Sequence, residues 1–534
     1  MSGAARIDAR IAAFAAAGRQ RAEPRPSLGV IAPELAAQEP DRVVLRDGEW
    51  TMTRGEMVDM ASRLGGALQA RGLRKGSVVA FQLPNWWEAC VINMAAALFG
   101  WRIVPLLPIY RRAELGQILP AAGVEALFLP PADDRINYHA LIEDLPGAPP
   151  LVFPVRGDGE GFEELIRADP ASPDPAESHD AKMIIFTSGS TGRPKGVIHS
   201  HASMDAVVRR TGAFWGLGER DVLYVPSPIG HIGGSIYAFE FPWITGCATI
   251  LEDRWDPARA VSRIDGEGVT FMAGATPFLR GLLDAAEAAG TGLPSLRRFI
   301  CGGASVPPEL IRDALRRFPS AVVSRAYGST EVPLACPGIR TRAEAETRAD
   351  TDGELAIEMR LLGPEAGLQE ADEEAGEIAF RGPQMCPGYL DPQDEAGAFA
   401  EDGFFRMGDL GRLTDGRFVT ITGRIKDIII RKGENISPLE VETLLLRHPS
   451  VANVAIVGAP DAERGEIAVA FVLPRPGQTF DMAAMAAHLQ AAGLARQKFP
   501  ERLELVESLP MNAVGKVQKP ELRRIAADRV AETG

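Results

Sequence analysis

The chain has 534 residues, of which 46% are hydrophobic and 24% are charged. A chain of this length divides into several domains, because single hydrophobic cores stop growing beyond ~250–300 residues. Asp and Glu number 71 against 57 Lys and Arg, which gives a formal net charge of −14. This balance excludes a general nucleic-acid coat, because phosphate binding requires clustered cations.

The spacing of the cysteines and the length of the apolar stretches indicate the cellular compartment of the protein. Cysteines stand at positions 90, 247, 301, 336 and 386, and none has a neighbour at CxxC spacing. Such wide spacing is typical of reduced thiols in a cytoplasmic protein. No uninterrupted apolar stretch reaches the ~18 residues of a transmembrane helix. The segment MSGAARIDARIAAFAAAGRQR is predicted to be an amphipathic helix rather than a targeting peptide. We therefore expect a cytoplasmic protein.

Helical and strand patterns alternate along the first part of the chain. Residues 57–71 and 86–99 show helical periodicity, whereas 78–83 and 103–107 are short apolar runs bounded by Gly or Pro and are predicted strands. Similar strand-like runs follow at 183–186, 222–225, 248–251, 269–273, 299–301 and 322–324. This β–α–β rhythm predicts an α/β fold, with a large N-terminal domain of parallel, helix-covered sheets.

The pattern changes in the last third of the chain. Strands become denser from about residue 376, which predicts a β-rich subdomain. Segment 343–375 holds eleven acidic residues against two arginines and is expected to be a solvated loop or hairpin face. The C-terminal part combines strand runs at 454–457 and 467–473 with helical patterns at 439–447 and 482–492. It is predicted to form a small α+β domain with its own core.

A glycine-rich segment offers the first chemical signal. Residues 184–199 read IIFTSGSTGRPKGVIH, so a strand runs into glycines and hydroxyls and then into Lys195. Glycines let a backbone approach an anion, hydroxyls donate to its oxygens, and the lysine adds a charge. The segment is no Walker loop, because Gly196 follows Lys195 and the chain continues as a strand. The nearby pair His199 and His201 lacks a third ligand at matching spacing and is expected to be ordinary packing.

Five segments together resemble one known family. TSGSTGRPKG at 187–196 is similar to the signature of the acyl-adenylate-forming (AMP-binding) superfamily. It is followed in the family's order by YGSTE at 327–331, GDL at 408–410, GRIKDIIIRKGENISPLEVE at 423–442 and NAVGKVQKPELR at 512–523. Residues 81–115 further resemble short- and medium-chain acyl-CoA synthetases and cyclohexanecarboxylate:CoA ligases. The chain is thus identified with the acyl-CoA synthetase branch.

The resemblance implies a fold and a reaction. It implies a large AMP-binding domain over 1–423, a hinge at 424–427 and a small mobile domain over 428–534. The expected reaction joins a carboxylic acid to the thiol of CoA through an acyl-AMP, with ATP as co-substrate and Mg²⁺ as metal. A carboxylate alone is a poor electrophile, and both steps concentrate negative charge, so cations and backbone donors must be aimed there.

The resemblance also implies a nucleotide site. Its expected residues are Thr187, Ser188, Gly189, Ser190, Thr191, Gly192, Lys195, Gly303, Ala304, Tyr327, Gly328, Thr330, Asp409 and Arg424. Tyr327 would stack on adenine, Thr330 would reach the α-phosphate, and Asp409 would accept both ribose hydroxyls. Glu331 is the expected Mg²⁺ ligand, which suits a hard cation that takes few protein ligands.

Further residues are implied to act in catalysis. Lys516 matches the adenylation lysine, with Lys519 as the nearby competitor, and Lys426 occupies the hinge. Lys432, Gly433 and Glu434 would serve the thioester step after the small domain rotates. His231 matches a gate residue between the acyl site and the tunnel for the thiol. The catalytic set is therefore expected to be Lys516, Glu331, His231 and Lys426.

The acyl site gives a hint of the substrate. No acid occurs between Pro226 and Phe239, although a buried ammonium needs a partner. We therefore expect an acid without a charged α-amine. Small residues would leave room for a ring or a medium chain, so that Gly234→Trp would harm bulky acids more than acetate. The expected lining is Gly233, Gly234, Ser235, Gly302 and Ala326.

Other readings stay open at this point. The chain could load a carrier-protein thiol instead of CoA, oxidise its adenylate as luciferases do, or bind nucleotide without turnover. The expected partners are the acid, ATP and CoA, with no nucleic acid and no transmembrane segment, and with a homodimer as one option. Pyrophosphate release with and without CoA separates these alternatives.

Overall fold

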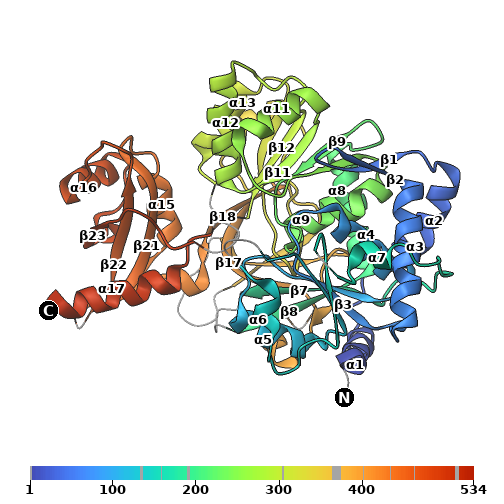
Figure 1. Cartoon of the computed structure of the whole chain (residues 1–534). Coiled ribbons are helices and arrows are strands. Elements are labelled where there is room, and N and C mark those ends of the chain that lie inside the picture. Colours follow the sequence, from blue (N-terminus) through green and yellow to red (C-terminus); the bar gives the residue numbers. More distant parts are fainter. Residues whose placement is uncertain are drawn as a thin grey trace.

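The computed structural model describes residues 3–132, 136–157, 159–188, 193–303, 306–363, 375–400, 402–432, 434–461, 463–511 and 516–533. Within these ranges no helix is both long and apolar enough to cross a membrane. Figure 1 shows a large N-terminal part and a smaller C-terminal lobe at one side, with β17 and β18 between them.

The first sheet carries the glycine-rich segment. Its strands lie in the order β16-β8-β7-β4-β3-β5-β6 and run parallel except at the β7–β8 and β8–β16 pairs. They are β3 (Val78–Phe81), β4 (Arg102–Pro105), β5 (Ala126–Leu129), β6 (Leu151–Pro154), β7 (Ala181–Ser188), β8 (Pro194–Ser200) and β16 (Gly388–Tyr389). Every residue of β3, β4 and β5 is buried, as expected of parallel strands covered on both faces.

The second sheet lies beside the first. Its order is β13-β12-β11-β9-β10-β1-β2, and only the β1–β2 pair among these strands is antiparallel. The strands are β1 (Val43–Asp47), β2 (Trp50–Thr53), β9 (Val222–Val225), β10 (Ala248–Leu251), β11 (Phe271–Gly274), β12 (Arg298–Gly302) and β13 (Val322–Ala326). A common core joins the two sheets, since Phe81 of β3 and Leu223 of β9 belong to one buried cluster.

Helices fill the space around these sheets (Figure 1). They are α1 (Gly3–Ala16), α2 (Leu28–Gln38), α3 (Arg54–Ala70), α4 (Trp87–Leu98), α5 (Arg112–Ala122), α6 (Tyr138–Ile142), α7 (Phe162–Leu165), α8 (His201–Trp215), α9 (Ile232–Ser235), α10 (Phe241–Ile244), α11 (Pro257–Glu267), α12 (Thr276–Ala289), α13 (Pro308–Arg317) and α14 (Arg342–Thr347). A π-helical turn, Ile236–Glu240, links α9 to α10. Helix α4 is buried from Glu88 to Leu98 and is apolar nearly all round.

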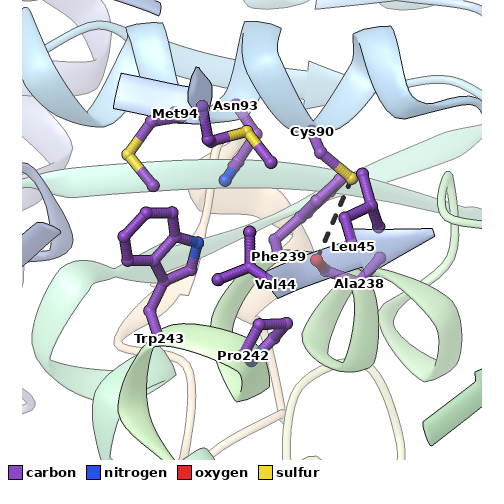
Figure 2. Close-up of a pocket in the computed structure, with 10 residues that line it drawn as sticks. Val44, Leu45, Cys90, Asn93, Met94, Ala238, Phe239, Pro242 and Trp243 are labelled. Atoms are coloured by element: carbon purple, nitrogen blue, oxygen red, sulfur yellow. Dashed lines mark hydrogen bonds between the residues drawn. The ribbon is translucent and has the colours of Figure 1, made fainter. Parts of the chain in front are cut away.

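A tiny cavity marks the packing between α4 and α10 (Figure 2). It measures about 10 Å³ and is lined by residues that include Cys90, Asn93 and Trp243. The carbonyl of Ala238 accepts from the Cys90 thiol at 3.9 Å, the long distance of a weak sulfur donor. The volume is close to that of one water, and none of the predicted site residues lines it. The cavity is therefore a packing feature.

The β-rich part is an antiparallel sheet in the order β14-β15-β17-β18. Its strands are β14 (Glu358–Leu362), β15 (Ala375–Arg381), β17 (Phe405–Thr414) and β18 (Phe418–Arg424), and a 3₁₀ turn, Pro392–Glu395, precedes β17.

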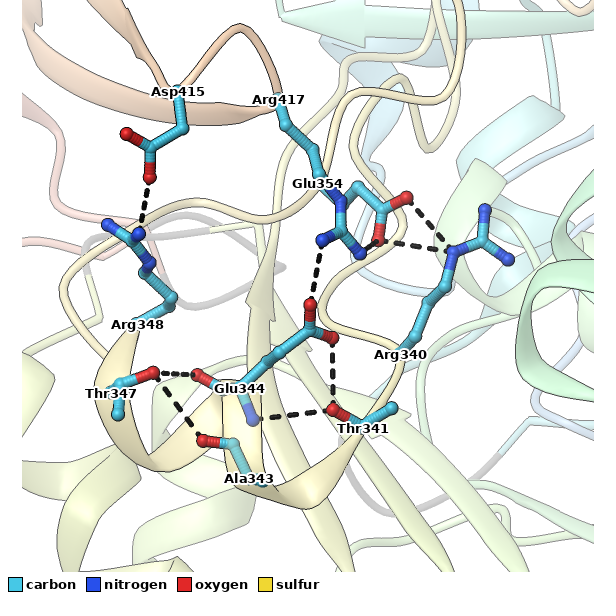
Figure 3. Close-up of polar contacts among 9 residues, drawn as sticks. All are labelled: Arg340, Thr341, Ala343, Glu344, Thr347, Arg348, Glu354, Asp415 and Arg417. Carbon is cyan, nitrogen blue, oxygen red and sulfur yellow. Dashed lines mark hydrogen bonds and ion pairs between the residues drawn. The ribbon is translucent and has the colours of Figure 1, made fainter.

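A polar network ties the β17–β18 turn to the acidic segment before β14 (Figure 3). Arg417 in the turn donates to Glu344 of α14 at 2.7 Å and to Glu354 at 2.9 Å. Glu354 also accepts from Arg340, and Arg348 contacts Asp415. The network anchors the hairpin whose far end carries Asp409 and Arg424.

The C-terminal lobe has its own sheet and core. The sheet order is β20-β19-β22-β21, with β23 beside β22. The elements are β19 (Ile429–Arg431), β20 (Glu434–Ile436), α15 (Pro438–Leu445), β21 (Val451–Asp461), β22 (Gly465–Pro474), α16 (Met482–Ala491), β23 (Arg502–Leu505) and α17 (Lys519–Thr533), with 3₁₀ turns at Ile425–Asp427 and Arg496–Lys498. Buried side chains such as Ile456 and Val472 belong to a cluster confined to this lobe.

The structure confirms the α/β class with parallel sheets and corrects one expectation. Within the first sheet, β7 and β8 form an antiparallel hairpin. The acidic segment holds helix α14 as well as strand β14, because Thr341 caps the helix and its acids pair with arginines. Residues 364–374 of that segment lie outside the described residues.

Candidate active site

The glycine-rich segment connects two antiparallel strands. Thr187 of β7 lies opposite Lys195 of β8 in the register, so the segment is a hairpin and not a strand-to-helix loop. Lys195 Nζ lies 3.5 Å from an oxygen of Asp394 and 5.7 Å from the centre of the Tyr389 ring. The lysine predicted to meet phosphates is thus held at the edge of this hairpin. Gly189, Ser190, Thr191 and Gly192 lie outside the described residues, as does the side chain of Ser188.

Tyr327 and Arg424 converge on Asp409. The Tyr327 hydroxyl donates to Asp409 Oδ2 at 2.5 Å, and Arg424 Nε donates to Oδ1 at 2.8 Å. The β17–β18 register places Asp409 opposite Arg424. Burial and then the Asp409 charge raise the pKa of Tyr327, so the phenol stays protonated and can donate. Asp409 is thereby oriented, and each of its oxygens can still accept a further donor.

The loop after Tyr327 is fixed on both sides. The Thr330 carbonyl accepts from His199 Nε2 at 2.7 Å, and the Glu331 carbonyl accepts from the amide of Cys386 at 2.7 Å. The Glu331 carboxylate accepts from the Tyr389 hydroxyl at 2.8 Å. Burial lowers the pKa of His199 to about 4, so its ring is neutral and one nitrogen donates. Thr330 is buried, whereas Gly328 at the turn is exposed.

The donor set suits magnesium delivered with phosphates. Among the described residues, no three His, Cys, Asp or Glu side chains form a cluster that could hold a metal ion alone. Mg²⁺ keeps several waters and is commonly bound through one or two carboxylates plus substrate phosphates. Glu331, with one oxygen engaged by Tyr389, offers one such carboxylate.

Lys516 of the C-terminal lobe faces this constellation. Burial and the charges of Arg424 and Lys426 lower the pKa of Lys516, while Asp409 and Glu331 act in the opposite direction. Its side chain keeps contact with solvent. Lys516 thus lies among charged groups of the large part while its side chain is partly open to solvent. Residues 512–515 before it lie outside the described residues.

The predicted competitor lies elsewhere. Lys519 Nζ is 2.7 Å from Glu442, inside the C-terminal lobe. Lys426 is exposed in the 3₁₀ turn between the two parts, and Arg523 bonds to the Lys426 carbonyl at 3.2 Å and to Asp427 at 2.5 Å. The structure thus brings Lys516, and not Lys519, to the charged groups of the large part.

His231 stands at the start of α9. Its Nδ1 accepts from the amide of Gly233 at 3.1 Å, which leaves the proton of the neutral ring on Nε2. Burial and the positive charge of Lys516 lower the pKa of His231 to about 4. The loop before it is held by Asn85, which bonds to the carbonyls of Val225 and Ser227 and to the amide of Ile229.

The small residues predicted for the acyl site fall in two places. Gly302 and Ala326 are neighbours across β12 and β13. Gly233, Gly234 and Ser235 all lie in α9. Gly303 is exposed with φ of +82°, and Ala304 lies outside the described residues.

The packing around Gly234 argues against the expected effect of Gly234→Trp. An added Cβ at Gly234 would lie 2.3 Å from the carbonyl oxygen of Pro228 and 2.5 Å from that of Ser227. Backbone atoms cannot yield as side-chain ends do. A substitution there would therefore distort the loop rather than narrow a pocket. At Gly233 the nearest atom to an added Cβ is His231 Nδ1, at 3.4 Å, which is ordinary contact.

One acid follows the acid-free stretch directly. Glu240, in the π-helical turn, lies 2.8 Å from Lys182 Nζ of β7, and both side chains are 3% exposed. A buried carboxylate and ammonium neutralise one another at this distance. Glu240 is thus already partnered.

The predicted thioester loop lies in the β19–β20 hairpin of the C-terminal lobe. Lys432 and Glu434 are exposed, and Lys432 has a positive φ of +51°. Its amide donates to the carbonyl of Arg464 at 2.9 Å, which holds the hairpin on the lobe. Gly433 lies outside the described residues.

Sequence reasoning missed Asn85, Tyr389 and the contact made by His199. Only the polar character of Asn85 within an otherwise apolar stretch could have drawn attention to it. The HxH pair did attract attention, yet its function is structural at His199, which holds the Thr330 carbonyl.

Two family models match the chain. The AMP-binding enzyme model covers residues 33–390, and the AMP-binding enzyme C-terminal domain model covers residues 440–516. The chain therefore belongs to the family of AMP-binding enzymes.

Relatives and solved structures agree with this assignment. The chain is 31% identical over 513 residues to the medium-chain fatty-acid–CoA ligase of Escherichia coli (strain K12), covering 93% of this chain and 90% of that protein. It is 32% identical over 502 residues to the 3-[(3aS,4S,7aS)-7a-methyl-1,5-dioxo-octahydro-1H-inden-4-yl]propanoyl:CoA ligase of Mycobacterium tuberculosis (strain ATCC 25618 / H37Rv), covering 92% and 97%. ATP-bound MatB from Rhodopseudomonas palustris superposes with a TM-score of 0.83 at 27% identity, covering 94% of this chain and 99% of that one. The chain is accordingly an AMP-forming acid–thiol ligase that uses ATP, Mg²⁺ and CoA.

Proposed function

We propose that the enzyme activates a medium-chain or alicyclic carboxylic acid, such as cyclohexanecarboxylate, and transfers the acyl group to CoA. The observation that carries the substrate class is the pairing of Glu240 with Lys182. Residues 226–239 contain no acid. The next residue, Glu240, is already neutralised by Lys182, so it is not available to pair with a substrate ammonium. An acid with an uncharged body fits this environment.

In the first half-reaction a carboxylate oxygen of the acid attacks the α-phosphorus of ATP, and pyrophosphate leaves. Lys516 would bridge the two negatively charged reactants as charge develops, because a flexible ammonium is suited to this task. Asp409, oriented by Tyr327 and Arg424, would accept the ribose hydroxyls. Glu331 would hold Mg²⁺, which supplies positive charge to the phosphates when bound.

In the second half-reaction the sulfur of CoA attacks the acyl carbonyl, and AMP leaves. The site residues of this step would be Lys432, Gly433 and Glu434, brought in by rotation of residues 428–534 against 1–423. Residues 424–427 would act as the hinge, with Lys426 within it. In support, β18 ends at Arg424, β19 begins at Ile429, and only a short 3₁₀ turn joins them.

His231 would act as the gate between the acid and the thiol. Its neutral ring and its bond to the Gly233 amide favour one tautomer and one ring orientation. A neutral gate can stand beside the acyl chain without adding a buried charge.

The names of the relatives support both a medium-length acyl chain and an alicyclic ring in the proposed substrate. One acts on medium-chain fatty acids, and the name of another describes a propanoyl group on an octahydro-indene ring. Both acids lack an amine in those names.

A panel of acids tests the proposal. Purified enzyme is incubated with ATP, Mg²⁺, CoA and either linear C2–C12 acids, cyclohexanecarboxylate, benzoate or sterol-like acids, and the thioesters are measured by mass spectrometry. The same assay is run with α-amino acids of similar size. We expect the highest kcat/KM for C6–C10 or alicyclic acids, and no turnover of the α-amino acids. A preference for amino acids, or equal use of all acids, would reject the substrate class.

The acceptor is tested in the same reaction. Replacing CoA with phosphopantetheinylated carrier protein separates free-CoA ligation from carrier loading, and pyrophosphate release without either thiol measures adenylation alone. Turnover restricted to the carrier would favour the alternative loading function. Absence of any pyrophosphate would favour a non-catalytic nucleotide-binding module.

We further propose that the enzyme works in the cytoplasm. In support, all five cysteines are buried free thiols. A homodimer stays a prediction, which sedimentation velocity at several concentrations would test.

A further inference from the structure

Tyr389 lies between two groups that the reaction would use. It is 4% exposed, and its strand β16 pairs with β8, the strand of Lys195. The ring faces the Lys195 ammonium at 5.7 Å, and the hydroxyl donates to Glu331 Oε1 at 2.8 Å. One buried side chain therefore touches both the expected phosphate lysine and the expected metal carboxylate.

The segment around Tyr389 holds Glu331 at a second point. The amide of Cys386 donates to the Glu331 carbonyl at 2.7 Å. With both its carbonyl and its carboxylate bound, Glu331 has few directions left to turn. The oxygen engaged by Tyr389 faces the phenol, so Oε2 is the oxygen set for a cation.

The N-terminal helix braces this segment from behind. Arg10 Nε of α1 donates to the Tyr389 carbonyl at 2.9 Å. Arg10 and Arg19 both contact Glu395, which accepts from the Tyr389 amide at 3.3 Å. Phe14 packs so closely on Gly388 that an added Cβ there would meet its ring at 2.4 Å. Helix α1 thus fixes the backbone of Tyr389 on both sides.

We propose that Tyr389 is a positioning residue for the metal carboxylate and that α1 is part of the device that holds it. This inference rests on the proposed role of Glu331 in the proposed function. The hydroxyl selects the rotamer of Glu331, while the ring places Lys195 beside it. Partners that orient a metal-binding carboxylate typically contribute about 10–100-fold to metal affinity.

The test measures metal binding without the acid. Mn²⁺ replaces Mg²⁺, and free Mn²⁺ is titrated by electron paramagnetic resonance against enzyme saturated with ATP. Tyr389→Phe keeps the ring under Lys195 but loses the hydroxyl, and we expect about tenfold weaker Mn²⁺ binding. Tyr389→Leu also loses the ring and is expected to weaken ATP binding in addition.

Tyr224→Phe is the matched control. Tyr224 is 1% exposed, and its hydroxyl donates to a carboxylate, Glu252, at 2.7 Å. The Tyr224→Phe substitution removes a buried hydroxyl–carboxylate hydrogen bond of the same kind, at a place distant from the site. We expect Mn²⁺ affinity within twofold of the wild type, with a Tm shift similar to that of Tyr389→Phe.

A double-mutant cycle with Glu331→Gln separates positioning from general destabilisation. If Tyr389 acts through Glu331, Tyr389→Phe changes Mn²⁺ affinity little once Glu331 is replaced. Arg10→Met is expected to weaken binding by two- to threefold and Arg10→Lys to restore most of it.

The positioning role of Tyr389 and the proposed ligase function can fail independently of one another. Wild-type Mn²⁺ affinity in Tyr389→Phe, or an equal loss in the Glu331→Gln background, would overturn the positioning role. An enzyme that forms no thioester, yet loses Mn²⁺–ATP binding on Tyr389→Phe, would reject the proposed function and leave the positioning role intact.

Discussion

Lys519 Nζ lies 2.7 Å from Glu442 Oε1, and this ion pair separates the two candidate lysines of the C-terminal lobe. Glu442 also accepts from the Ile456 amide at 2.7 Å, so Lys519 serves the packing of α17 on the lobe. Lys516 instead interacts electrostatically with the carboxylates of Asp409 and Glu331. The two lysines lie three residues apart and have different surroundings.

Lys516→Ala should abolish adenylation and spare thioester formation. Loss of one preorganised cation from a developing charge typically costs about 100–1000-fold. Pyrophosphate exchange measures the first half-reaction, and CoA thioester formation from synthetic acyl-AMP measures the second. Equal loss of both half-reactions would contradict alternation of the small domain.

Lys519→Ala is the matched lysine variant. We expect exchange within about threefold of the wild type and a loss of about 1–2 kcal/mol in stability, because Glu442 loses a partner in a largely buried pair. Calorimetry checks the stability. Loss of exchange without a fall in Tm would assign the adenylation lysine to position 519.

A salt bridge between the two parts bears on the domain arrangement. Arg447, after α15, contacts Glu309 of α13 at 3.1 Å, and both side chains are about half exposed. Glu309→Lys should favour departure from the observed arrangement and slow pyrophosphate exchange by about two- to fivefold, the size expected of an exposed pair. The double reversal Glu309→Lys/Arg447→Glu should recover most of the rate. A double variant slower than either single variant would contradict a direct contact in solution.

Local apolar runs predicted the strands well where a turn bounds the run at both ends. Residues 222–225 and 248–251 are strands β9 and β10 to the residue, because a run of apolar residues ends at a turn on each side. Helix α3 begins at Arg54 rather than at 57, because Thr53 and Glu56 form a capping box that extends it beyond the apolar pattern. Hydrophobic periodicity gives no information on such capping residues, so it places the start of the helix too late.

The contacts that build the site join positions far apart in the sequence. Tyr389 binds Glu331 across 58 residues, and Arg10 reaches Tyr389 across 379. Motifs identify which residues are present, but these contacts form only once the tertiary fold brings α1, the loop after β13 and strand β16 together. The crowding of Lys516 by Arg424 and Asp409 likewise depends on how the C-terminal lobe docks.

Asn85→Ala should disturb the loop that leads to His231. Its amide nitrogen donates at 3.1 Å and 2.9 Å to two carbonyls, and its oxygen accepts from Ile229 at 2.9 Å. Buried groups left without partners cost about 1–3 kcal/mol each. We expect a lower Tm and a raised KM for the acid, with the KM for ATP unchanged, in steady-state kinetics.

Asn93→Ala provides a comparison on the next helix. Asn93 is also buried, but it lines the cavity of Figure 2, and its oxygen lacks a hydrogen-bond partner among the described residues. This variant should leave the KM for the acid unchanged. A similar KM increase in both variants would mean that the effect of Asn85 is not specific to the His231 loop.

Gly233 and Gly234 should respond differently to substitution. Gly234→Ala places a methyl group 2.3 Å from a backbone oxygen and should lower Tm and reduce activity equally on all acids. Gly233→Ala has room beside His231, and Gly233→Leu should discriminate by acid size. The measurement is kcat/KM over C2–C12 acids. Size discrimination at Gly234 and uniform loss at Gly233 would reverse this assignment.

His201 should make folding stability sensitive to acid. It is 4% exposed, and neither ring nitrogen has a hydrogen-bond partner among the described residues. Burial and the charge of Lys182, which is itself paired with Glu240, hold the pKa of His201 well below its usual 6.5. Below pH ~6.5 the unfolded chain therefore binds a proton that the folded chain does not, so stability falls as pH falls.

His201→Leu removes this proton uptake and an unpartnered polar ring. We expect the free energy of unfolding, measured in urea, to be at least equal to the wild type at pH 7.5 and to decline less steeply between pH 6.5 and 5. Since no polar partner is lost, the substitution should not leave a buried group unsatisfied. An unchanged acid slope would mean that His201 is protonated in the folded chain, and that Glu240 rather than Lys182 dominates its surroundings.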